Sequence, residues 1–334
     1  MQVAIIGAGL IGNKRAAAIR KLPECKLVAV CDLNLERAKK LAQEFGAEAY
    51  QSWEEMGTRR DDIELVIVAT INKFLAPIAL FFLERGKHVL CEKPLGRNAS
   101  ESKLMVEAAR ERGVKLKTGF NHRHHPGIAR ARQLVAEGQI GKISFLRCRY
   151  GHGGRPGYEH EWRADKDLCG GGELLDQGVH VVDLFRWFVG EFHEAFGYLS
   201  TYFWKMEVED NAFALFKTKA GQIAFMHTSW TQWKNLFSFE VFGSEGYVVV
   251  EGLGGSYGPQ RLRIGRRRPE GWVPEEEFID FPGEDISWEE ECKELVQAIK
   301  ENREPLGSGW DGYQANRMLG AVYESVRLGR PVNL

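Results

Sequence analysis

Short apolar runs alternate with charged, amphipathic segments over the first 121 residues. Runs of this length are typical of buried parallel strands, and the segments between them have the spacing and composition of helices. The alternation predicts a doubly wound parallel sheet, which binds ligands at the carboxyl ends of its strands. The expected strands are residues 2–6, 26–32, 64–70, 88–94 and 115–121, and the helices between them include 13–22, 35–46 and 100–113.

The pattern changes after residue 121. A helix at 126–141 is followed by strand-like runs joined by glycine turns, which predicts an α+β domain with a mostly antiparallel open sheet. Two helices, 287–303 and 311–329, close the chain. The helices are too few to cover both faces of this sheet, so we expect a homodimer or homotetramer that pairs sheet against sheet. The expected strands are 142–151, 195–204, 210–218, 221–231, 236–246, 247–252, 261–265 and 276–281.

The turn after the first strand reads Gly-Ala-Gly-Leu-Ile-Gly. Gly7 permits a tight turn, Gly9 lets the backbone approach a pyrophosphate, and Gly12 lets the helix pack on the strand. Asp32 ends the second strand about twenty residues later, where it accepts hydrogen bonds from ribose hydroxyls and repels a 2′-phosphate. A plain tight turn, the alternative interpretation, leaves this acid unexplained. We therefore predict a Rossmann domain at 1–120 that binds NAD rather than NADP, followed by a substrate-binding and oligomerisation domain at 121–334.

The carboxyl ends of the remaining strands carry Thr70, Lys93 and Asn121. Lys93 follows an apolar strand and precedes Pro94, and a lysine held in such a place is costly to keep charged. Its position therefore calls for a functional reason, and the predicted cofactor site supplies one. The expected cofactor contacts are Gly7, Gly9, Leu10, Ile11, Gly12, Asp32, Thr70, Asn72, Glu92, Lys93 and Asn121.

Composition narrows the classes of function. A formal net charge of −1 over 334 residues gives no reason to expect nucleic acid or an anionic membrane as a partner. The longest apolar run, residues 74–83, is too short to cross a bilayer, and the chain opens on a strand rather than on a secretion signal. Six cysteines are scattered without a C-x-x-C pair, so we expect a cytoplasmic protein with reduced thiols and no structural metal.

A largely buried helix is expected at residues 172–190, with polar residues on one side. Asp176, His180 and Asp183 follow one another at spacings of four and three. They either satisfy the core through an internal Asp–His hydrogen bond or face a ligand. Three glycines open the helix, and Gly178 lies within it at a cost of about 1 kcal/mol relative to alanine; both features favour a ligand.

These motifs together resemble the Gfo/Idh/MocA family of sugar and inositol dehydrogenases. The resemblance covers essentially the whole chain and rests on GAGLIG, GKHVLCEKPLG, GFNHRHHP, EWR, GGGELLDQGVH and the closing DGYQANRMLGAVYESVRLGRPVNL. It implies that Lys93, Asp176 and His180 carry the chemistry. In one departure, Ile71 and Leu75 stand where the family often has proline and histidine. We interpret this change as the loss of a local packing or capping contact rather than of catalysis.

The residue types suit the oxidation of a secondary alcohol, in which a hydride leaves carbon while a base takes the hydroxyl proton. An imidazole titrates near neutral pH, so His180 is the expected base, and Asp176 orients it or binds a neighbouring hydroxyl. Lys93, whose bond to Pro94 the resemblance implies to be cis, would stabilise the developing alkoxide. Lys93 as the base, with His180 as a relay, remains an open alternative because coupled groups share protons.

The loop at 150–172 is expected to select the substrate. Its aromatic side chains would stack on a pyranose or cyclitol ring, and its arginines would meet hydroxyls, carboxylate or phosphate. The alternative is a solvated loop with an Arg–acid network. The expected substrate contacts are Arg123, Tyr158, Trp162, Arg163, Asp176 and His180, with Arg155 nearby.

Two further clusters have simpler interpretations. His122, His124 and His125 lack a carboxylate or cysteine at suitable spacing, so no zinc site is expected. The basic run at 261–268 lies near the acidic run at 275–277, which indicates a charged hairpin tip. A docking point for a nucleotide-sugar phosphate is the alternative for this run.

The sequence therefore predicts an NAD-dependent dehydrogenase. Its substrate would be a secondary alcohol of a sugar, of a sugar derivative such as a nucleotide-linked or uronic one, or of an inositol. One alternative is a glycosidase or lyase that retains NAD and oxidises its substrate only transiently. The other is a non-catalytic dinucleotide-binding sensor, against which the intact Lys93, Asp176 and His180 argue.

Overall fold

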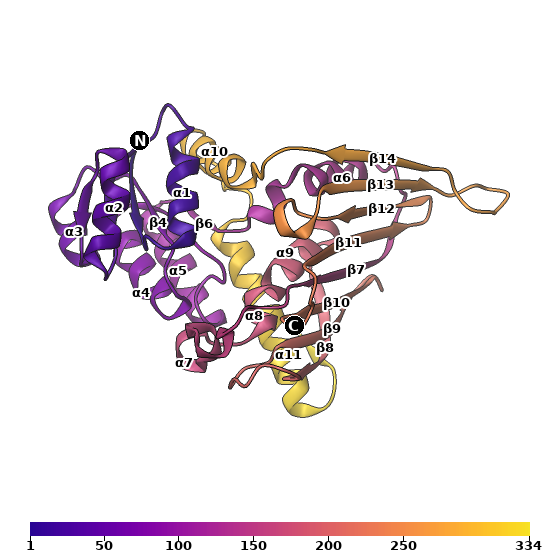
Figure 1. Cartoon of the computed structure of the whole chain (residues 1–334). Coiled ribbons are helices and arrows are strands. Elements are labelled where there is room, and N and C mark those ends of the chain that lie inside the picture. The colour runs from indigo at the N-terminus through magenta and orange to yellow at the C-terminus, as the bar shows by residue number, and fades with distance from the viewer. The chain divides into compact units, whose positions relative to one another are not determined.

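The computed structural model describes residues 1–334, and the chain forms two compact units (Figure 1). The first unit comprises Met1–Asn121 and Trp288–Asn316, and the second comprises His122–Ser287 and Arg317–Leu334. The sequence pattern assigned everything after residue 120 to one domain, whereas Trp288–Asn316 packs with the first unit. The reason is that the helix in this segment buries an apolar face in the core of the parallel sheet.

Six strands form the parallel sheet of the first unit, and helices connect them. The elements are β1 (Gln2–Ile6), α1 (Leu10–Arg20), β2 (Lys26–Cys31), α2 (Leu35–Phe45), β3 (Glu48–Tyr50), α3 (Trp53–Arg59), β4 (Leu65–Val68), α4 (Asn72–Leu83), β5 (His88–Cys91), α5 (Ala99–Arg112) and β6 (Leu116–Thr118), with α10 (Ser287–Lys300) and the start of α11 (Gly309–Leu328). The strand order is β3-β2-β1-β4-β5-β6, and every pair is parallel. The predicted doubly wound sheet is confirmed, and its strand order reverses between β1 and β4, where ligands bind in such folds.

The second unit contains a nine-stranded sheet. Its elements are η1 (Asn121–His124), α6 (Pro126–Ala136), β7 (Ile143–Gly151), η2 (Tyr158–His160), η3 (Trp162–Ala164), α7 (Lys166–Cys169), α8 (Glu173–Asp176), α9 (Gly178–Val189), β8 (Phe192–Ser200), β9 (Asn211–Thr218), β10 (Ile223–Ser229), β11 (Leu236–Gly243), β12 (Gly246–Glu251), η4 (Gly255–Tyr257), β13 (Gln260–Arg266), β14 (Glu276–Phe281) and β15 (Val332–Asn333). The order is β14-β13-β12-β11-β7-β10-β9-β8-β15, and only β7 and β10 pair in parallel. This confirms the predicted mostly antiparallel sheet.

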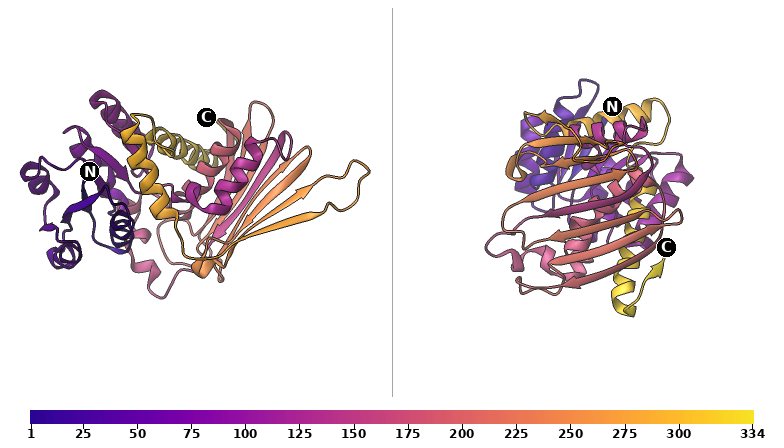
Figure 2. Two further views of the ribbon diagram at one scale, coloured as in Figure 1. Left: turned by 90° about the horizontal axis from the view of Figure 1, so that it is seen from above. Right: turned by 90° about the vertical axis from the view of Figure 1, so that its right-hand side faces the viewer.

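One face of the nine-stranded sheet is covered by helices and the other is open. Helices α6, α8 and α9 contact the strands from the same side, and the right-hand view of Figure 2 looks onto the opposite, uncovered face. Side chains alternate accordingly along β7, where Leu146 and Cys148 are buried and Phe145 and Arg147 are exposed. No helix of the chain combines the length and the apolar character needed to cross a membrane.

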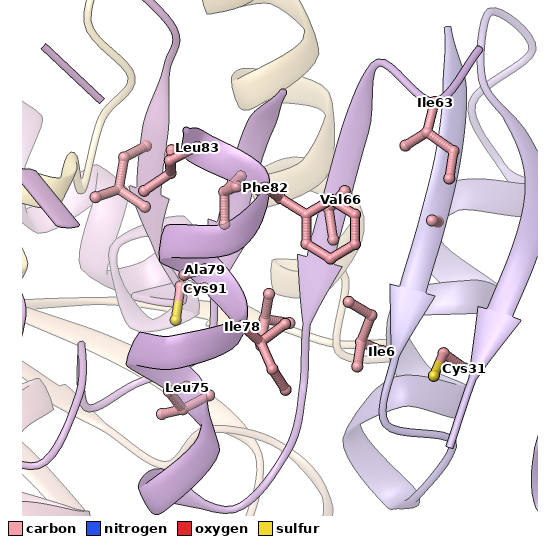
Figure 3. Packing of buried hydrophobic residues seen from close by; sticks show 14 of the residues in the cluster. Ile6, Cys31, Ile63, Val66, Leu75, Ile78, Ala79, Phe82, Leu83 and Cys91 are labelled. Atoms are coloured by element: carbon pink, nitrogen blue, oxygen red, sulfur yellow. The ribbon is translucent and has the colours of Figure 1, made fainter. Parts of the chain in front are cut away.

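The core of the first unit lies on both faces of its sheet. On one face α4 directs Leu75, Ile78 and Phe82 toward strand residues that include Ile6 and Val66 (Figure 3). On the other face α1, α2 and α10 pack together against the strands. Because the strands are buried on both faces, they read in the sequence as continuous apolar runs.

Two expected elements of the second unit differ from the structure. The single helix expected at 172–190 is divided into α8 and α9 at Gln177. The strand expected at 195–204 runs instead over Phe192–Ser200. It ends because the Asp210 carboxylate accepts hydrogen bonds from the backbone amides of residues 202, 203 and 204, which turns the chain.

Candidate active site

The glycine turn of the first unit fits a dinucleotide. Gly7 has a φ of +98°, and a Cβ atom there would lie 2.3 Å from the carbonyl oxygen of Ala69. A Cβ atom at Gly12 would lie 1.8 Å from the carbonyl oxygen of Gly7, whereas one at Gly9 would meet no protein atom within 4 Å. Gly7 and Gly12 are therefore required by the fold, and the space at Gly9 is open to a ligand. No side chain caps the N-terminus of α1, so its first amides are available for a pyrophosphate.

Asp32 lies beside this turn and holds it. One carboxylate oxygen accepts a hydrogen bond from the amide of Ala8 at 2.8 Å, and the other accepts one from the amide of Asn34 at 2.8 Å. The side chain of Asn13 donates to the carbonyl oxygens of Ala8 and Gly9. Asp32 thus has a local role in shaping the turn, and its remaining lone pairs can still accept ribose hydroxyls.

The other expected cofactor residues of the first unit follow the carboxyl ends of β4, β5 and β6. Thr70 follows β4, and Asn72 is buried in the first turn of α4. Lys93 is half-buried after β5, and the expected cis bond to Pro94 is confirmed. Asn121 is buried after β6.

The two positions at which the chain departs from the family, Ile71 and Leu75, lie at the start of α4 and within it. Leu75, in the histidine position, is fully buried in the core beneath α4. Ile71, in the proline position, is the N-terminal flanking residue of α4 and has extended backbone geometry. Leu75 therefore belongs to the core beneath α4, and Ile71 leads into the helix.

Glu92 has a buried partner that the sequence did not reveal. The guanidinium of Arg15 on α1 donates to its carboxylate at 2.5 and 2.7 Å and to the carboxylate of Glu291 on α10 at 2.6 Å. Arg15 and Glu291 are fully buried, and Glu92 nearly so. We therefore interpret Glu92 as a residue that fixes the strand end before Lys93, instead of the cofactor contact expected from the sequence.

His180 of the second unit lies near the start of α9 and is 4% exposed. Its ring stacks on that of His122, with the centroids 3.8 Å apart and the planes 24° apart. His122 in turn packs against the rings of Tyr150 and Phe237. These contacts hold the His180 imidazole in one orientation.

Asp176 ends α8, one residue before the break in the helix. The guanidinium nitrogen Nε of Arg163 lies 3.5 Å from its carboxylate, and a second nitrogen of Arg163 lies 3.5 Å from the carboxylate of Glu161. Burial disfavours the charged form of Arg163, whereas the nearby Asp176 carboxylate favours it. The pKa of Arg163 is raised overall. Arg163 and Asp176 are therefore neighbours.

Asp183 and Arg123 form a buried ion pair. The guanidinium of Arg123 donates to the Asp183 carboxylate at 2.5 and 2.8 Å, and the two side chains are 3% and 1% exposed. The same guanidinium lies 5.3 Å from the ring centroid of Trp187. We therefore interpret Arg123, expected from the sequence to contact substrate, as a residue that joins η1 to α9.

The aromatic residues of the substrate loop are packed against one another. Tyr158 is 2% exposed and lies in a cluster with Trp204 and Trp230, and Trp162 packs against the edge of this cluster. Burial raises the pKa of Tyr158, and the charge of Asp176 contributes. The ring of Tyr158 is thus part of the scaffold of the loop, while Trp162 is half-buried and has the guanidinium of Arg163 4.5 Å from its ring centroid.

The glycines before α8 serve the protein itself, which corrects the expectation that they make room for a ligand. A Cβ atom at Gly171 would lie 2.2 Å from the hydroxyl of Tyr323, and one at Gly172 would lie 2.1 Å from the carbonyl oxygen of Glu209. At Gly178 the neighbour is Met226, at 2.9 Å. Close packing of the chain around α8 therefore accounts for these small residues.

Gln177 and Tyr257 were not identified from the sequence. The Gln177 amide donates to the Tyr257 hydroxyl at 3.1 Å, and the ring of Tyr257 lies 5.5 Å from that of Tyr150. Gln177 stands between Asp176 and His180, which was a usable signal. Nothing in the local sequence indicates that Tyr257, some eighty residues later, lies beside it.

The basic run at 261–268 forms the charged hairpin that the sequence predicted. Each of its arginines lies within ion-pair distance of a carboxylate on β14 or on a neighbouring strand or turn, as in the 2.6 Å contact between Arg261 and Asp280. No group of three or more His, Cys, Asp or Glu side chains in the chain is arranged to hold a metal ion.

A doubly wound sheet with an open glycine turn and an uncapped helix start is typical of dinucleotide-binding domains. Residues 1–120 match the model of the oxidoreductase family with an NAD-binding Rossmann fold, and residues 128–249 match the GFO/IDH/MocA C-terminal domain. The chain belongs to the Gfo/Idh/MocA family. It is an NAD-dependent oxidoreductase that acts on CH–OH groups, and the predicted family and cofactor are confirmed.

Individual relatives agree with this assignment. The chain is 29% identical to levoglucosan dehydrogenase of Pseudarthrobacter phenanthrenivorans over 75% of its length and 73% of the relative's. It is 28% identical to inositol 2-dehydrogenase of Rubrobacter xylanophilus over 98% and 92% of the two chains. A solved structure of levoglucosan dehydrogenase in complex with NADH superimposes with a TM-score of 0.91 at 25% identity, covering 100% of this chain and 98% of that one.

Proposed function

We propose that the chain oxidises a secondary alcohol of a sugar, a sugar derivative or an inositol, and that Lys93, Asp176 and His180 carry the reaction. The observation that supports this most directly is the His180 imidazole, which is buried, stacked on His122 and four residues after Asp176 in the chain. An imidazole held in this way is suited to general-base catalysis near neutral pH. Dehydrogenases of levoglucosan and of inositol among the relatives support the substrate class.

Each residue has a defined task in this proposal. Bound NAD supplies the acceptor for the hydride. His180 takes the proton of the reacting hydroxyl, and Lys93 donates a hydrogen bond to the same oxygen as negative charge develops on it. Asp176, adjacent to Arg163, accepts a hydrogen bond from a neighbouring substrate hydroxyl. The glycine turn and the first amides of α1 hold the pyrophosphate, and Asp32 accepts the adenosine ribose hydroxyls.

A screen of sugars and cyclitols for NADH formation tests this function. The purified protein with added NAD is expected to produce NADH with at least one neutral or derivatised polyol, and NADP is expected to support a much lower rate because Asp32 repels its 2′-phosphate. Conversion of a glycoside without net NADH would identify the NAD-retaining alternative. Dinucleotide binding without any turnover across the screen would contradict the proposal and favour a sensor.

We further propose a homodimer or homotetramer that forms through the open face of the nine-stranded sheet. This face carries Phe145, Tyr198, Leu215 and Ile223, which are 37%, 67%, 45% and 46% exposed. Strand pairing places these four apolar side chains on one side of the sheet.

All six cysteines are free thiols, which supports a reducing compartment such as the cytoplasm.

A further inference from the structure

The arginines that precede α8 are already paired with carboxylates of the second unit. Arg155 lies 2.7 Å from Glu161. Arg163 lies between Glu161 and Asp176, 3.5 Å from each. Two guanidinium groups therefore share two carboxylates, and neither is left with an unneutralised charge that would attract a carboxylate or phosphate on the substrate.

The second unit also places two acidic residues, Glu173 and Asp176, on the short helix that precedes Gln177. Glu173 is fully buried, and Asp176 ends the same short helix. Burial raises the pKa of Tyr257 to about 12, and the charges of Glu173 and Asp176 contribute in the same direction. An anionic group brought to the Tyr257 hydroxyl would meet this negative potential with no free arginine from the preceding loop to offset it.

Gln177 supplies an uncharged hydrogen-bonding group at the same place. The side chain is 5% exposed, and its Nε2 donates to the Tyr257 hydroxyl at 3.1 Å. The amide oxygen Oε1 is buried and accepts no hydrogen bond. A buried acceptor left in this state costs about 1–3 kcal/mol, and a hydroxyl donor from a bound molecule would remove that cost. A carboxylate or phosphate dianion has no proton to donate and would leave it in place.

We infer that the site takes an uncharged polyhydroxylated substrate and that Gln177 and Tyr257 bind its hydroxyl groups. The inference rests on the proposed dehydrogenase function, and it narrows the substrate from sugars in general to neutral sugars and cyclitols. Uronic acids, sugar phosphates and nucleotide-linked sugars are disfavoured because Arg155 and Arg163, the arginines of the loop before α8, are already paired with carboxylates. Gln177 accepts from one hydroxyl, and Tyr257, whose ring lies 5.5 Å from that of Tyr150, binds a neighbouring one.

The experiment compares matched substrates on the whole protein with NAD. Each neutral hexose in the panel is assayed beside its uronate and its 6-phosphate, and NADH formation is followed for all three. The neutral member is expected to exceed both anionic members in kcat/KM by about tenfold or more, which corresponds to the loss of one to two hydrogen bonds. A panel in which an anionic member is preferred overturns the inference while the dehydrogenase function stands. A panel that yields no NADH with any member overturns the function itself, and the inference with it.

Two pairs of variants test the residues. Tyr257→Phe is expected to raise KM for the best neutral substrate by about three- to tenfold with the dissociation constant for NAD unchanged. Tyr247→Phe, which removes a hairpin hydroxyl bonded to Glu276, is the matched control and should change neither. An unchanged KM in Tyr257→Phe would overturn the role of Tyr257.

Charge pairing is tested in the same assay. Glu161→Gln frees positive charge on its two arginine partners, so the ratio of kcat/KM for the uronate to that for the neutral sugar is expected to rise by about tenfold. Glu159→Gln makes the same charge change at a carboxylate for which no arginine partner is found and should leave the ratio nearly unchanged. Equal ratios in wild type and Glu161→Gln would overturn the charge argument.

Discussion

At the scale of the residue, the three glycines of the turn after β1 are required for different reasons. Gly7 and Gly12 have no room for a Cβ atom because backbone oxygens lie 2.3 and 1.8 Å from where it would be. Gly9 has no protein neighbour within 4 Å of that position. The first two glycines are therefore required by the fold, and the space at the third is open to the cofactor that we propose to bind there.

This distinction predicts opposite phenotypes. Gly9→Val should abolish NAD binding by occupying the space of the pyrophosphate, and it should leave the melting temperature within a few degrees of wild type. Gly12→Ala should lower the melting temperature, since its Cβ atom overlaps the carbonyl of Gly7. Calorimetric titration with NAD and thermal unfolding distinguish the two. Normal NAD affinity in Gly9→Val would remove Gly9 from the cofactor site.

Two buried thiols are expected to lower the stability of the protein at alkaline pH. Burial raises the pKa of Cys169 and of Cys292 to about 11, from an ordinary value of 9.0. Below pH 9 both thiols are protonated in the folded and unfolded states. Between pH 9 and about 11 the unfolded chain loses these protons first, so the free energy of unfolding falls as the pH rises.

We expect the melting temperature to decrease between pH 9 and about pH 11, and to decrease less steeply in Cys292→Ala. The substitution removes one thiol that would otherwise ionise in the unfolded state, although it also leaves a small cavity that lowers stability at every pH. Thermal unfolding in a series of alkaline buffers gives both slopes. Identical slopes in the two proteins would show that Cys292 is not the buried acid described here.

At the scale of the element, α8 is short and depends on contacts from distant parts of the chain. One carboxylate oxygen of Glu209 accepts hydrogen bonds from the amides of Gly172 and Leu174 at 3.1 Å and from the hydroxyl of Tyr323 at 2.8 Å. Burial raises the pKa of Glu209, and the three hydrogen bonds oppose this rise. These contacts fix the start of the helix that ends at Asp176.

Tyr323→Phe is therefore expected to lower the free energy of unfolding by about 1 kcal/mol, because it removes one hydrogen bond from a buried carboxylate. It should also lower kcat through displacement of Asp176, with NAD affinity unchanged. Tyr202→Phe, a change at a tyrosine that is 68% exposed and lies outside the proposed assembly face, is the control for both measurements. Wild-type stability and kcat in Tyr323→Phe would show that Glu209 holds α8 without the tyrosine.

The elements that the sequence predicted well are those whose pattern is local. The strands of the parallel sheet are buried on both faces and are read directly as apolar runs. The edge strand β3 was missed because it has only three residues, and the break between α8 and α9 was missed because Gln177 and its neighbours have no strong helix-breaking signal apart from Gly178. The early end of β8 depends on Asp210, which lies ten residues beyond Ser200 in the chain and whose effect is visible only in the structure.

The candidate site also combines features that are local in the sequence with features that are not. Its motif residues, such as Asp32, Lys93 and His180, could be proposed from the sequence because each follows a recognisable strand end or lies on a recognisable helix. The contacts around these residues could not be predicted. Arg15 and Glu92 are 77 positions apart in the chain, and Gln177 and Tyr257 are 80 positions apart. Local patterns carry no information about such long-range pairs. For the same reason Arg123 was assigned to substrate although Asp183 holds it.

At the scale of the whole molecule, the open face of the nine-stranded sheet predicts self-association. Leu215→Arg places a charge among exposed apolar side chains of this face, so it should reduce the mass in solution toward that of a monomer. Leu104→Arg, at an exposed apolar position on α5 of the first unit (54%, against 45% for Leu215), is the matched control and should leave the mass unchanged. Light scattering at micromolar concentration provides the comparison. A monomeric wild-type protein would contradict the proposed assembly.

The central claim is that Lys93 and His180 act together on the reacting hydroxyl, and a double-mutant cycle on NADH formation tests it most directly. Lys93→Ala and His180→Ala are each expected to lower kcat by about a hundredfold or more with little change in NAD affinity, and Lys103→Ala, at an exposed lysine of α5, should have no effect. The double variant should lose less than the product of the two single losses, because residues that act as a unit are not additive. Near-wild-type turnover in folded Lys93→Ala, or strictly multiplicative losses, would contradict the account.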